Sequence, residues 1–269
     1  MPELPEVETV TNSIKRHILN KSFKSIHLNW QKTLENFTVD EFNAKAKNKP
    51  ITDVYRRGKY IVIAFNDCIL AVHLRMTGKL YVVEELDVNK KHISVYLKFS
   101  NKYLIFEDTR KFGRFYLYKD IKYLNGKLGV EPLSHNFSEN WLLDSIKSRS
   151  RQMKPLLLDQ SFIAGIGNIY ADEALWHASI HPLSISSNLS KKKIKILREG
   201  IIKVLSESIK LGGTTIRDYT YDFSYVGNYA INLNVFGKEG SNCSRCDTII
   251  IKSKVAQRGT HFCPKCQKK

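Results

Sequence analysis

The residues next to the N-terminus have the types and spacing that covalent catalysis needs. Pro2 becomes a free secondary amine once Met1 is removed, and such an amine can attack an aldehyde-like carbon to form an iminium. An ordinary α-amino group has a pKa of about 8, so a useful neutral fraction exists at neutral pH. Glu3 and Glu6 follow three residues apart and would lie close together on a helix. This segment therefore offers a nucleophile with carboxylates beside it.

The same opening also has a purely structural explanation. Proline and glutamate are favoured in the first turn of a helix, where they suit the geometry and the helix dipole. Apolar residues then recur at helical intervals, at Val7, Val10, Ile14 and Ile18. The pattern predicts an amphipathic helix, and by itself it does not separate catalysis from helix capping.

Four of the five cysteines form two C-x-x-C pairs, Cys243 with Cys246 and Cys263 with Cys266, separated by sixteen residues. Each pair can point two thiolates at one ion, and four sulfurs close a tetrahedral Zn²⁺ shell with no position left for water. Two disulfides are the alternative, but they need an oxidising compartment, and no signal peptide is apparent. The spacing favours one structural Zn²⁺. Cys68 lies alone in an apolar, strand-like run, which predicts a buried, inert thiol.

The charge of the chain indicates a polyanionic partner. Its 43 Lys and Arg against 26 Asp and Glu give a net charge of +17, with a pI near 9.6. An AT-rich genome would account for part of the lysine excess. No apolar run is long enough to span a membrane and no lipidation motif appears, so nucleic acid is favoured over a membrane surface.

The regular elements that would carry these groups change in character along the chain. Residues from about 23 to 119 contain alternating β-branched and aromatic runs, which predict a mostly antiparallel β-sandwich. Helical periodicity begins near Ser138, continues through 191–211 and ends at Gly212-Gly213; residues 214–232 read as a loop. The fold class predicted is α+β, with domains at 1–130 (catalytic sandwich), 131–232 (helical) and 233–269 (zinc finger).

Two glycines and an asparagine separate two of the helical patterns. Gly165 and Gly167 permit a tight turn, and Asn168 begins the helix that follows. Backbone amides at the start of a helix bind phosphate well. A plain packed turn between helices is an equally valid interpretation of this segment alone.

Together these motifs resemble one family. The opening from Pro2 to Thr9, the turn from Gly165 to Ala171, Gly212-Gly213-Thr214-Thr215 and the four-cysteine finger occur in the order found in bacterial formamidopyrimidine-DNA glycosylase. Leu4 makes the opening more similar to this enzyme than to its endonuclease VIII relatives. The resemblance implies a helix-two-turns-helix domain and a bifunctional glycosylase and AP lyase. Its partner would be double-stranded DNA carrying oxidised purines, such as 8-oxoguanine and formamidopyrimidines, or abasic sites.

The resemblance also implies roles for the residues at the N-terminus. Pro2 would attack C1′ of the damaged nucleotide, and β and δ eliminations would then cut the strand. Glu3 would protonate the sugar ring oxygen and shuttle protons, and Glu6 would support the site through hydrogen bonds. Lys59, in a segment that otherwise reads as an ordinary hairpin turn, would contact the phosphate beside the lesion.

Further residues match positions that the family uses to hold DNA. Met76, Arg110 and Phe112 would fill the gap left by an extruded base, and Arg110 would read the opposite base. On residue type alone, Met76 and Phe112 would be assigned to the core. The implied DNA-binding set is His73, Met76, Arg110, Phe112, Asn168 and Arg258, with Arg258 held at the tip of the zinc hairpin.

One segment departs from the family pattern. Residues 222–229 lack the Gly and Pro of the loop that usually caps the extruded base, so we expect this segment to change the lesion preference while leaving the Pro2 chemistry intact. Two alternatives stay open: an enzyme acting on oxidised pyrimidines, as in the endonuclease VIII branch, and a non-catalytic DNA-binding protein. A monomer in the bacterial cytoplasm, associated with the nucleoid through DNA, is expected.

Overall fold

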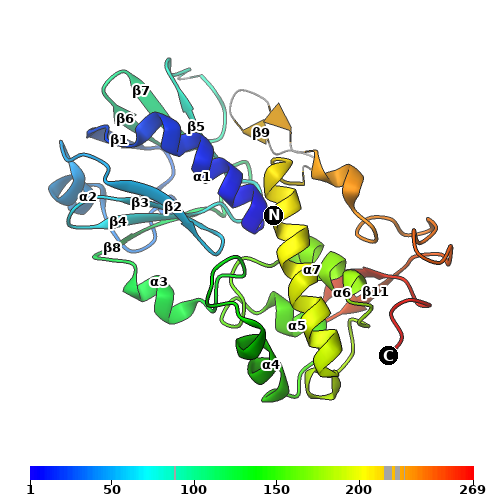
Figure 1. Ribbon diagram of the computed structural model, residues 1–269. Helices are drawn as coiled ribbons and strands as arrows, with labels where there is room; N and C mark the ends of the chain where they lie inside the picture. The colour runs from blue at the N-terminus through cyan, green and yellow to red at the C-terminus, as the bar shows by residue number, and fades with distance from the viewer. Residues whose placement is uncertain (88, 215–219, 222–224, 227) are drawn as a thin grey trace. The chain divides into compact units, whose positions relative to one another are not determined.

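The computed structural model describes residues 1–269 except 88, 215–219, 222–224 and 227 (Figure 1). The chain forms two compact units. The first comprises Met1–Gly126 with Gly212–Asn228, and the second Lys127–Leu211 with Tyr229–Lys269. The three-part division by residue range stays a prediction. No helix in the described part of the chain is long and apolar enough to cross a membrane.

The first unit begins with the helix that the N-terminal pattern predicts. Helix α1 (Leu4–Ile18) buries its apolar face, with the side chains of Val7 and Ile14 almost fully covered. Pro5 stands in the first turn, and the Glu6 carboxylate accepts the Glu3 N–H at 2.8 Å, which satisfies one of the free amides of the helix start. Thus the two glutamates of the opening are linked by a hydrogen bond.

Two four-stranded antiparallel sheets form the body of the first unit (Figure 1). One has the order β1-β6-β7-β5 and the other β2-β3-β4-β8. The strands are β1 (Phe23–Leu28), β2 (Asp53–Arg57), β3 (Tyr60–Ala64), β4 (Ile69–His73), β5 (Lys79–Val83), β6 (Ile93–Phe99), β7 (Lys102–Glu107) and β8 (Arg114–Tyr118).

The two sheets and α1 share one core. Burial alternates along β5 and β8, as expected for strands with one face inward, and buried side chains from both sheets belong to a single apolar cluster. This confirms the predicted sandwich and the burial of Cys68. The periodicity did not reveal α2 (Val39–Ala46), α3 (Lys122–Lys127) or the short helix η1 (Gln31–Thr33). Strands β9 (Thr220–Tyr221) and β10 (Tyr225–Val226) pair within the segment read as a loop.

The second unit contains the predicted helices. They are α4 (Glu139–Lys147), α5 (Met153–Leu158), α6 (Asn168–His177) and α7 (Lys191–Lys210), with short helices η2 (Ser186–Asn188) and η3 (Tyr229–Asn232). Ser138 and Ser190 cap α4 and α7 by accepting backbone N–H groups. Helix α7 ends where the glycine pair predicts, and Gly212 and Gly213 take φ of 77° and 90°.

A two-stranded hairpin, β11 (Ile251–Val255) and β12 (Arg258–Phe262), follows the first cysteine pair. Its turn has only two residues, Ala256 and Gln257, with φ of 46° and 62°. Positive φ at both positions gives the twist that a tight hairpin needs, although glycine or asparagine is the usual choice. The hairpin therefore ends in a strained tip beside Arg258.

Candidate functional site

Glu6 links the N-terminus of the first unit to the segment that follows α7. Its Oε2 accepts the Glu3 N–H at 2.8 Å, and its Oε1 accepts the Thr214 N–H at 2.7 Å. Pro2, Glu3 and Glu6 are all buried. Gly213 must be a glycine here, because a Cβ would lie 3.0 Å from Glu6 Oε1 and its φ is 90°. The carboxylate of Glu6 thus holds both the start of α1 and Thr214, in the segment that follows α7.

Lys59 lies in the two-residue turn between β2 and β3. Gly58 takes φ of 58°, which the first position of such a turn requires. The Lys59 side chain is only 5% exposed, unlike that of an ordinary hairpin lysine. Arg56 Nε donates to Glu8 Oε2 at 2.6 Å, which ties β2 to α1. The strand that precedes Lys59 is therefore fixed to the helix that begins just after Pro2 and Glu3.

His73 ends β4 and shapes the loop that carries Met76. Its Nδ1 accepts the Arg75 N–H at 3.0 Å, and its ring packs edge-on against Tyr60. Burial, with smaller effects from the charges of Arg75 and Lys59, lowers the pKa of His73 to about 3. The imidazole is therefore neutral, as an acceptor at Nδ1 must be.

Met76 and Phe112 are exposed, with 44% and 47% of their surface accessible. Large apolar side chains are normally covered, so two on neighbouring loops of one unit indicate a contact surface. The Arg110 guanidinium lies over the Phe112 ring, 4.9 Å from its centroid. The core assignment that residue type alone suggests is wrong for Met76 and Phe112.

In the second unit, Asn168 and the zinc hairpin are in direct contact. Asn168 Nδ2 donates to the Gly259 carbonyl at 3.0 Å, and Lys154 Nζ donates to the same oxygen at 3.0 Å. Gly259 directly follows Arg258, whose side chain is exposed. The structure therefore brings Asn168 and Arg258, separated by 90 positions in the chain, onto one small region of this unit.

Two buried carboxylates on α6 hold the segments of the zinc finger, and sequence reasoning missed both. Asp172 accepts the His261 N–H at 2.9 Å and pairs with Lys154, while Glu173 accepts the Val235 and Phe236 N–H groups at 2.9 Å each. Asp172 and Glu173 have no exposed surface. The signal available in the sequence was that Asp172 and Glu173 are charged residues inside an otherwise mostly apolar helical pattern.

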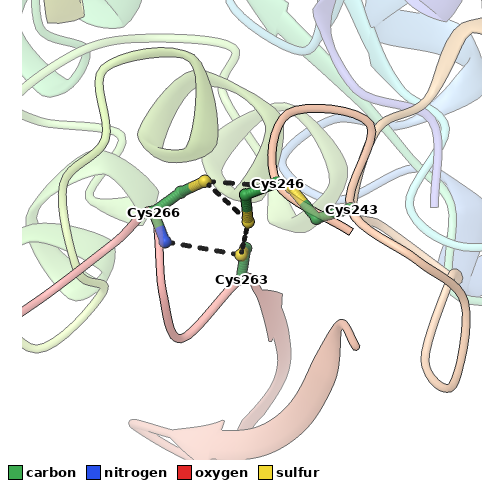
Figure 2. A group of neighbouring side chains, drawn as sticks. All are labelled: Cys243, Cys246, Cys263 and Cys266. Atoms are coloured by element: carbon green, nitrogen blue, oxygen red, sulfur yellow. Dashed lines mark hydrogen bonds between the residues drawn. The ribbon is translucent and has the colours of Figure 1, made fainter. Parts of the chain in front are cut away.

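The four finger cysteines form a compact cluster. Their Sγ atoms all lie within 4.8 Å of one another, and Figure 2 shows them converging from two loops. A ZnS₄ tetrahedron with Zn–S bonds of about 2.3 Å needs S···S separations of about 3.8 Å. The Cys243–Cys266, Cys246–Cys263 and Cys246–Cys266 separations, at 3.9, 3.5 and 3.3 Å, are close to this value. Arg245 braces the first loop by donating to the Trp176 carbonyl at 2.8 Å while covering the Trp176 ring. The predicted structural zinc site is confirmed.

The remaining predicted residues divide between the two units. Pro2, Glu3, Glu6, Lys59, His73, Met76, Arg110 and Phe112 lie in the first unit; Asn168, Arg258 and the four cysteines lie in the second. The segment 222–229, whose altered sequence bears on lesion range, lies partly outside the described residues. The roles of the individual site residues stay predictions.

Comparison with known proteins shows the family of the chain. The chain is 42% identical to the formamidopyrimidine-DNA glycosylase of Ligilactobacillus salivarius, over 99% of both chains. It is 43% identical to that of Protochlamydia amoebophila, over 100% of both. The chain belongs to the formamidopyrimidine-DNA glycosylase family. The family's N-terminal domain matches residues 1–115, its H2TH domain 128–220, and the zinc finger found in FPG and IleRS 240–269.

Solved structures of family members also match over the full chain. The complex of a Lactococcus lactis FPG point mutant with DNA containing Fapy-dG has a TM-score of 0.93 at 38% identity, covering 100% of both chains. MutM in complex with DNA containing carbocyclic 8-oxo-G has a TM-score of 0.92 at 38% identity, with the same coverage. This glycosylase therefore shares the family's fold in each of its parts.

Proposed function

We propose that this protein excises oxidised purines from double-stranded DNA and cleaves the strand at the resulting abasic site. The observation that carries this proposal is the start of α1, where the Glu6 carboxylate accepts the N–H of the buried Glu3 directly after the buried Pro2. Relatives crystallised with DNA containing Fapy-dG, 8-oxo-G and an abasic site support the substrate class. The enzyme acts as a monomer, in the cytoplasm, where chromosomal DNA is present.

The chemistry begins at the amine of Pro2 after Met1 has been removed. The nitrogen lone pair forms a bond to C1′, the bond from C1′ to the base breaks, and the base leaves with its electron pair. The proton lost by the amine neutralises the departing base, and Glu3 donates a proton to the ring oxygen as the bond from C1′ to that oxygen breaks, leaving an iminium. The iminium acidifies the neighbouring C2′–H, so β elimination releases the 3′ phosphate and δ elimination releases the 5′ phosphate.

Cationic and amide side chains position the DNA. Lys59, Asn168 and Arg258 bind phosphates around the extruded nucleotide, and a guanidinium suits this role because it can form two parallel hydrogen bonds. Met76, Arg110 and Phe112 occupy the space that the base leaves. The exposure of Met76 and Phe112 supports this assignment, because a buried side chain could not enter a base stack.

The Zn²⁺, when bound by Cys243, Cys246, Cys263 and Cys266, supplies structural cross-linking of two short loops and no reacting group. Sulfur ligation at four positions leaves no site for water or substrate. The hairpin that carries Arg258 lies between the two cysteine pairs. The finger therefore orients Arg258 toward phosphate.

Borohydride trapping tests the proposal. Protein with Met1 removed is mixed with a duplex containing 8-oxoguanine, and reduction of the iminium should give a covalent adduct. An N-terminal tag should abolish the adduct, because the nitrogen then lies in an amide. Pro2→Gly should reduce it strongly, because it replaces the secondary amine with a primary one. Pro5→Ala is the matched control: it changes a proline in the same turn whose nitrogen is already in a peptide bond, so the adduct should persist.

The outcomes separate the competing functions. Absence of an adduct with every oxidised lesion would support a non-catalytic DNA-binding protein. An adduct that forms faster with thymine glycol than with 8-oxoguanine in single-turnover reactions would assign the enzyme to oxidised pyrimidines. An affinity for duplex DNA that falls steeply with salt would show the expected phosphate contacts.

A further inference from the structure

The carboxylate of Asp108 ties together the two loops that display the exposed side chains of the first unit. Asp108 directly follows β7 and has no exposed surface. Its Oδ1 accepts the Thr77 hydroxyl at 2.5 Å, and thus binds the loop that carries Met76. The same oxygen accepts the Arg110 N–H at 3.1 Å, and Oδ2 accepts the Gly113 N–H at 2.7 Å.

A second, independent feature brings the same two loops together. The ring of Phe106 is 1% exposed and is approached by Gly78 from one loop and by Gly113 from the other. A Cβ on Gly78 would lie 2.8 Å from this ring, and a Cβ on Gly113 would lie 2.2 Å from it, so neither position has room for a side chain. Both loops therefore close onto one aromatic ring as well as onto one carboxylate.

The side chains presented by these loops are Met76, Arg110 and Phe112. Arg110 is additionally held over the Phe112 ring, and Lys111, between them, takes φ of 57° with its ammonium 4.2 Å from the centre of the Trp30 ring. A left-handed backbone at a lysine is unfavourable and persists only where the surroundings impose it. The hydrogen bonds to Asp108, on either side of Lys111, impose it here.

We propose that Asp108 is a positioning residue for base extrusion, which holds the Met76 loop and the Arg110–Phe112 loop as one rigid wedge. This inference rests on the proposed function, since the wedge acts on a duplex from which a base is swung out. Side chains that must enter a base stack together have to be preorganised, because a displacement of about 1 Å in such a constellation can cost about a hundredfold in rate. Asp108 does not touch the reacting atoms.

The test is Asp108→Asn, which keeps the shape of the side chain. The amide oxygen can still accept from Thr77 and Arg110, but its NH₂ then faces the Gly113 N–H, donor against donor. Loss of a hydrogen bond to a charged acceptor predicts a fall of about tenfold or more in single-turnover excision of 8-oxoguanine from a duplex. The fluorescence increase of 2-aminopurine placed opposite the lesion, which reports the unstacking of that base when the protein binds, should fall in parallel.

Strand cleavage at a preformed abasic site in a single-stranded oligonucleotide provides the discriminating readout. No opposite strand has to be held apart there, so Asp108→Asn should stay within about twofold of the wild type. Thr77→Val, a milder change, should reduce duplex excision in the same direction. Asp120→Asn is the control: it makes the same substitution at a surface carboxylate that accepts the Lys122 N–H, and should change nothing.

Equal losses in the rates of duplex excision and single-strand cleavage would mean that Asp108 acts through the fold in general. Unchanged duplex excision would mean that the wedge does not depend on Asp108. Either result overturns the proposal. If the wild type itself forms no adduct, the proposed function fails. The 2-aminopurine comparison between wild type and Asp108→Asn still decides whether Asp108 holds the two loops as a wedge. A retained 2-aminopurine response in the variant would refute it.

Discussion

Lys154 Nζ lies 2.7 Å from Asp172 Oδ1, and neither side chain has any exposed surface. Lys154 also donates to the Gly259 carbonyl, and Asp172 accepts the His261 N–H, so the pair joins α5 and α6 to β12. A buried ion pair is compatible with a stable fold only if both charges and their hydrogen bonds are present, because burying either charge alone costs free energy. The pair therefore positions the hairpin beside Arg258.

Removal of one charge from this pair should destabilise the second unit strongly. Lys154→Met leaves the Asp172 carboxylate buried without its cation, and the free energy of unfolding should fall by about 3–5 kcal/mol. Urea denaturation followed by tryptophan fluorescence measures this. The matched control is Lys15→Met, which breaks the half-exposed pair with Asp53 and should cost less than about 1 kcal/mol. Equal effects of the two variants would contradict the interpretation.

Zinc removal should release the hairpin and weaken DNA binding without altering the N-terminal unit. One Zn²⁺ per chain should be released by a thiol-blocking reagent and detected with a colorimetric indicator, since four clustered thiolates bind one ion. Cys263→Ser should contain less metal and bind lesion DNA more weakly. Cys68→Ser, outside the cluster, should keep one Zn²⁺ per chain. A full zinc content in Cys263→Ser would rule out the assigned ligand set.

The stability of the first unit should decrease in mild acid because of His73. Its pKa of about 3 in the folded state lies below the value of about 6.5 in the unfolded chain, so the unfolded state binds the extra proton between these values. The contribution of His73 to the free energy of unfolding is complete above about pH 6.5. It falls as the pH drops toward 3, by up to about 2 kcal/mol from pH 7 to pH 5.

His73→Asn provides the comparison for this pH effect. Asparagine can keep the acceptor for the Arg75 N–H but does not titrate. Denaturation midpoints measured from pH 7.5 to pH 5 should therefore show a shallower slope in the variant. Parallel profiles for the two proteins would show that His73 does not cause the loss.

A side chain at Gly213 should disturb Glu6. Its φ of 90° and the 3.0 Å approach of a Cβ to Glu6 Oε1 predict that Gly213→Ala lowers the free energy of unfolding by about 1–2 kcal/mol. It should also slow strand cleavage at abasic sites. Gly126→Ala, in α3, has no atom within 4 Å of the new Cβ and should stabilise the protein by about 0.5–1 kcal/mol. Opposite signs for these two glycines in thermal denaturation are the expected result.

Local periodicity predicted most of the regular elements. Strands β1 to β8 lie within residues 23–119, and α4 and α7 lie where helical periodicity was expected, because apolar residues recur in each at the interval of its secondary structure. Helix α2 was missed because it is short and lies in a region rich in strands, and the pairing of β9 with β10 was missed because two-residue strands carry no period.

The candidate site was predictable only where chemistry depends on residue type and short spacing. The two cysteine pairs and the Pro2-Glu3 opening are of this kind, and they can be recognised without knowing the fold. Exposure is different: Met76 and Phe112 are apolar, and only the folded structure shows that their side chains face solvent.

The amino-acid sequence by itself determined the family, the zinc ligands and the residues able to form an iminium, since these follow from side-chain chemistry and from motifs a few residues long. Only the tertiary structure decided which polar groups organise them. Asp108 with Thr77, Glu6 with Thr214, and Asp172 with Lys154 meet across stretches of 31, 208 and 18 positions. No local pattern encodes such partners, because a buried carboxylate is stable only where folding brings donors to it.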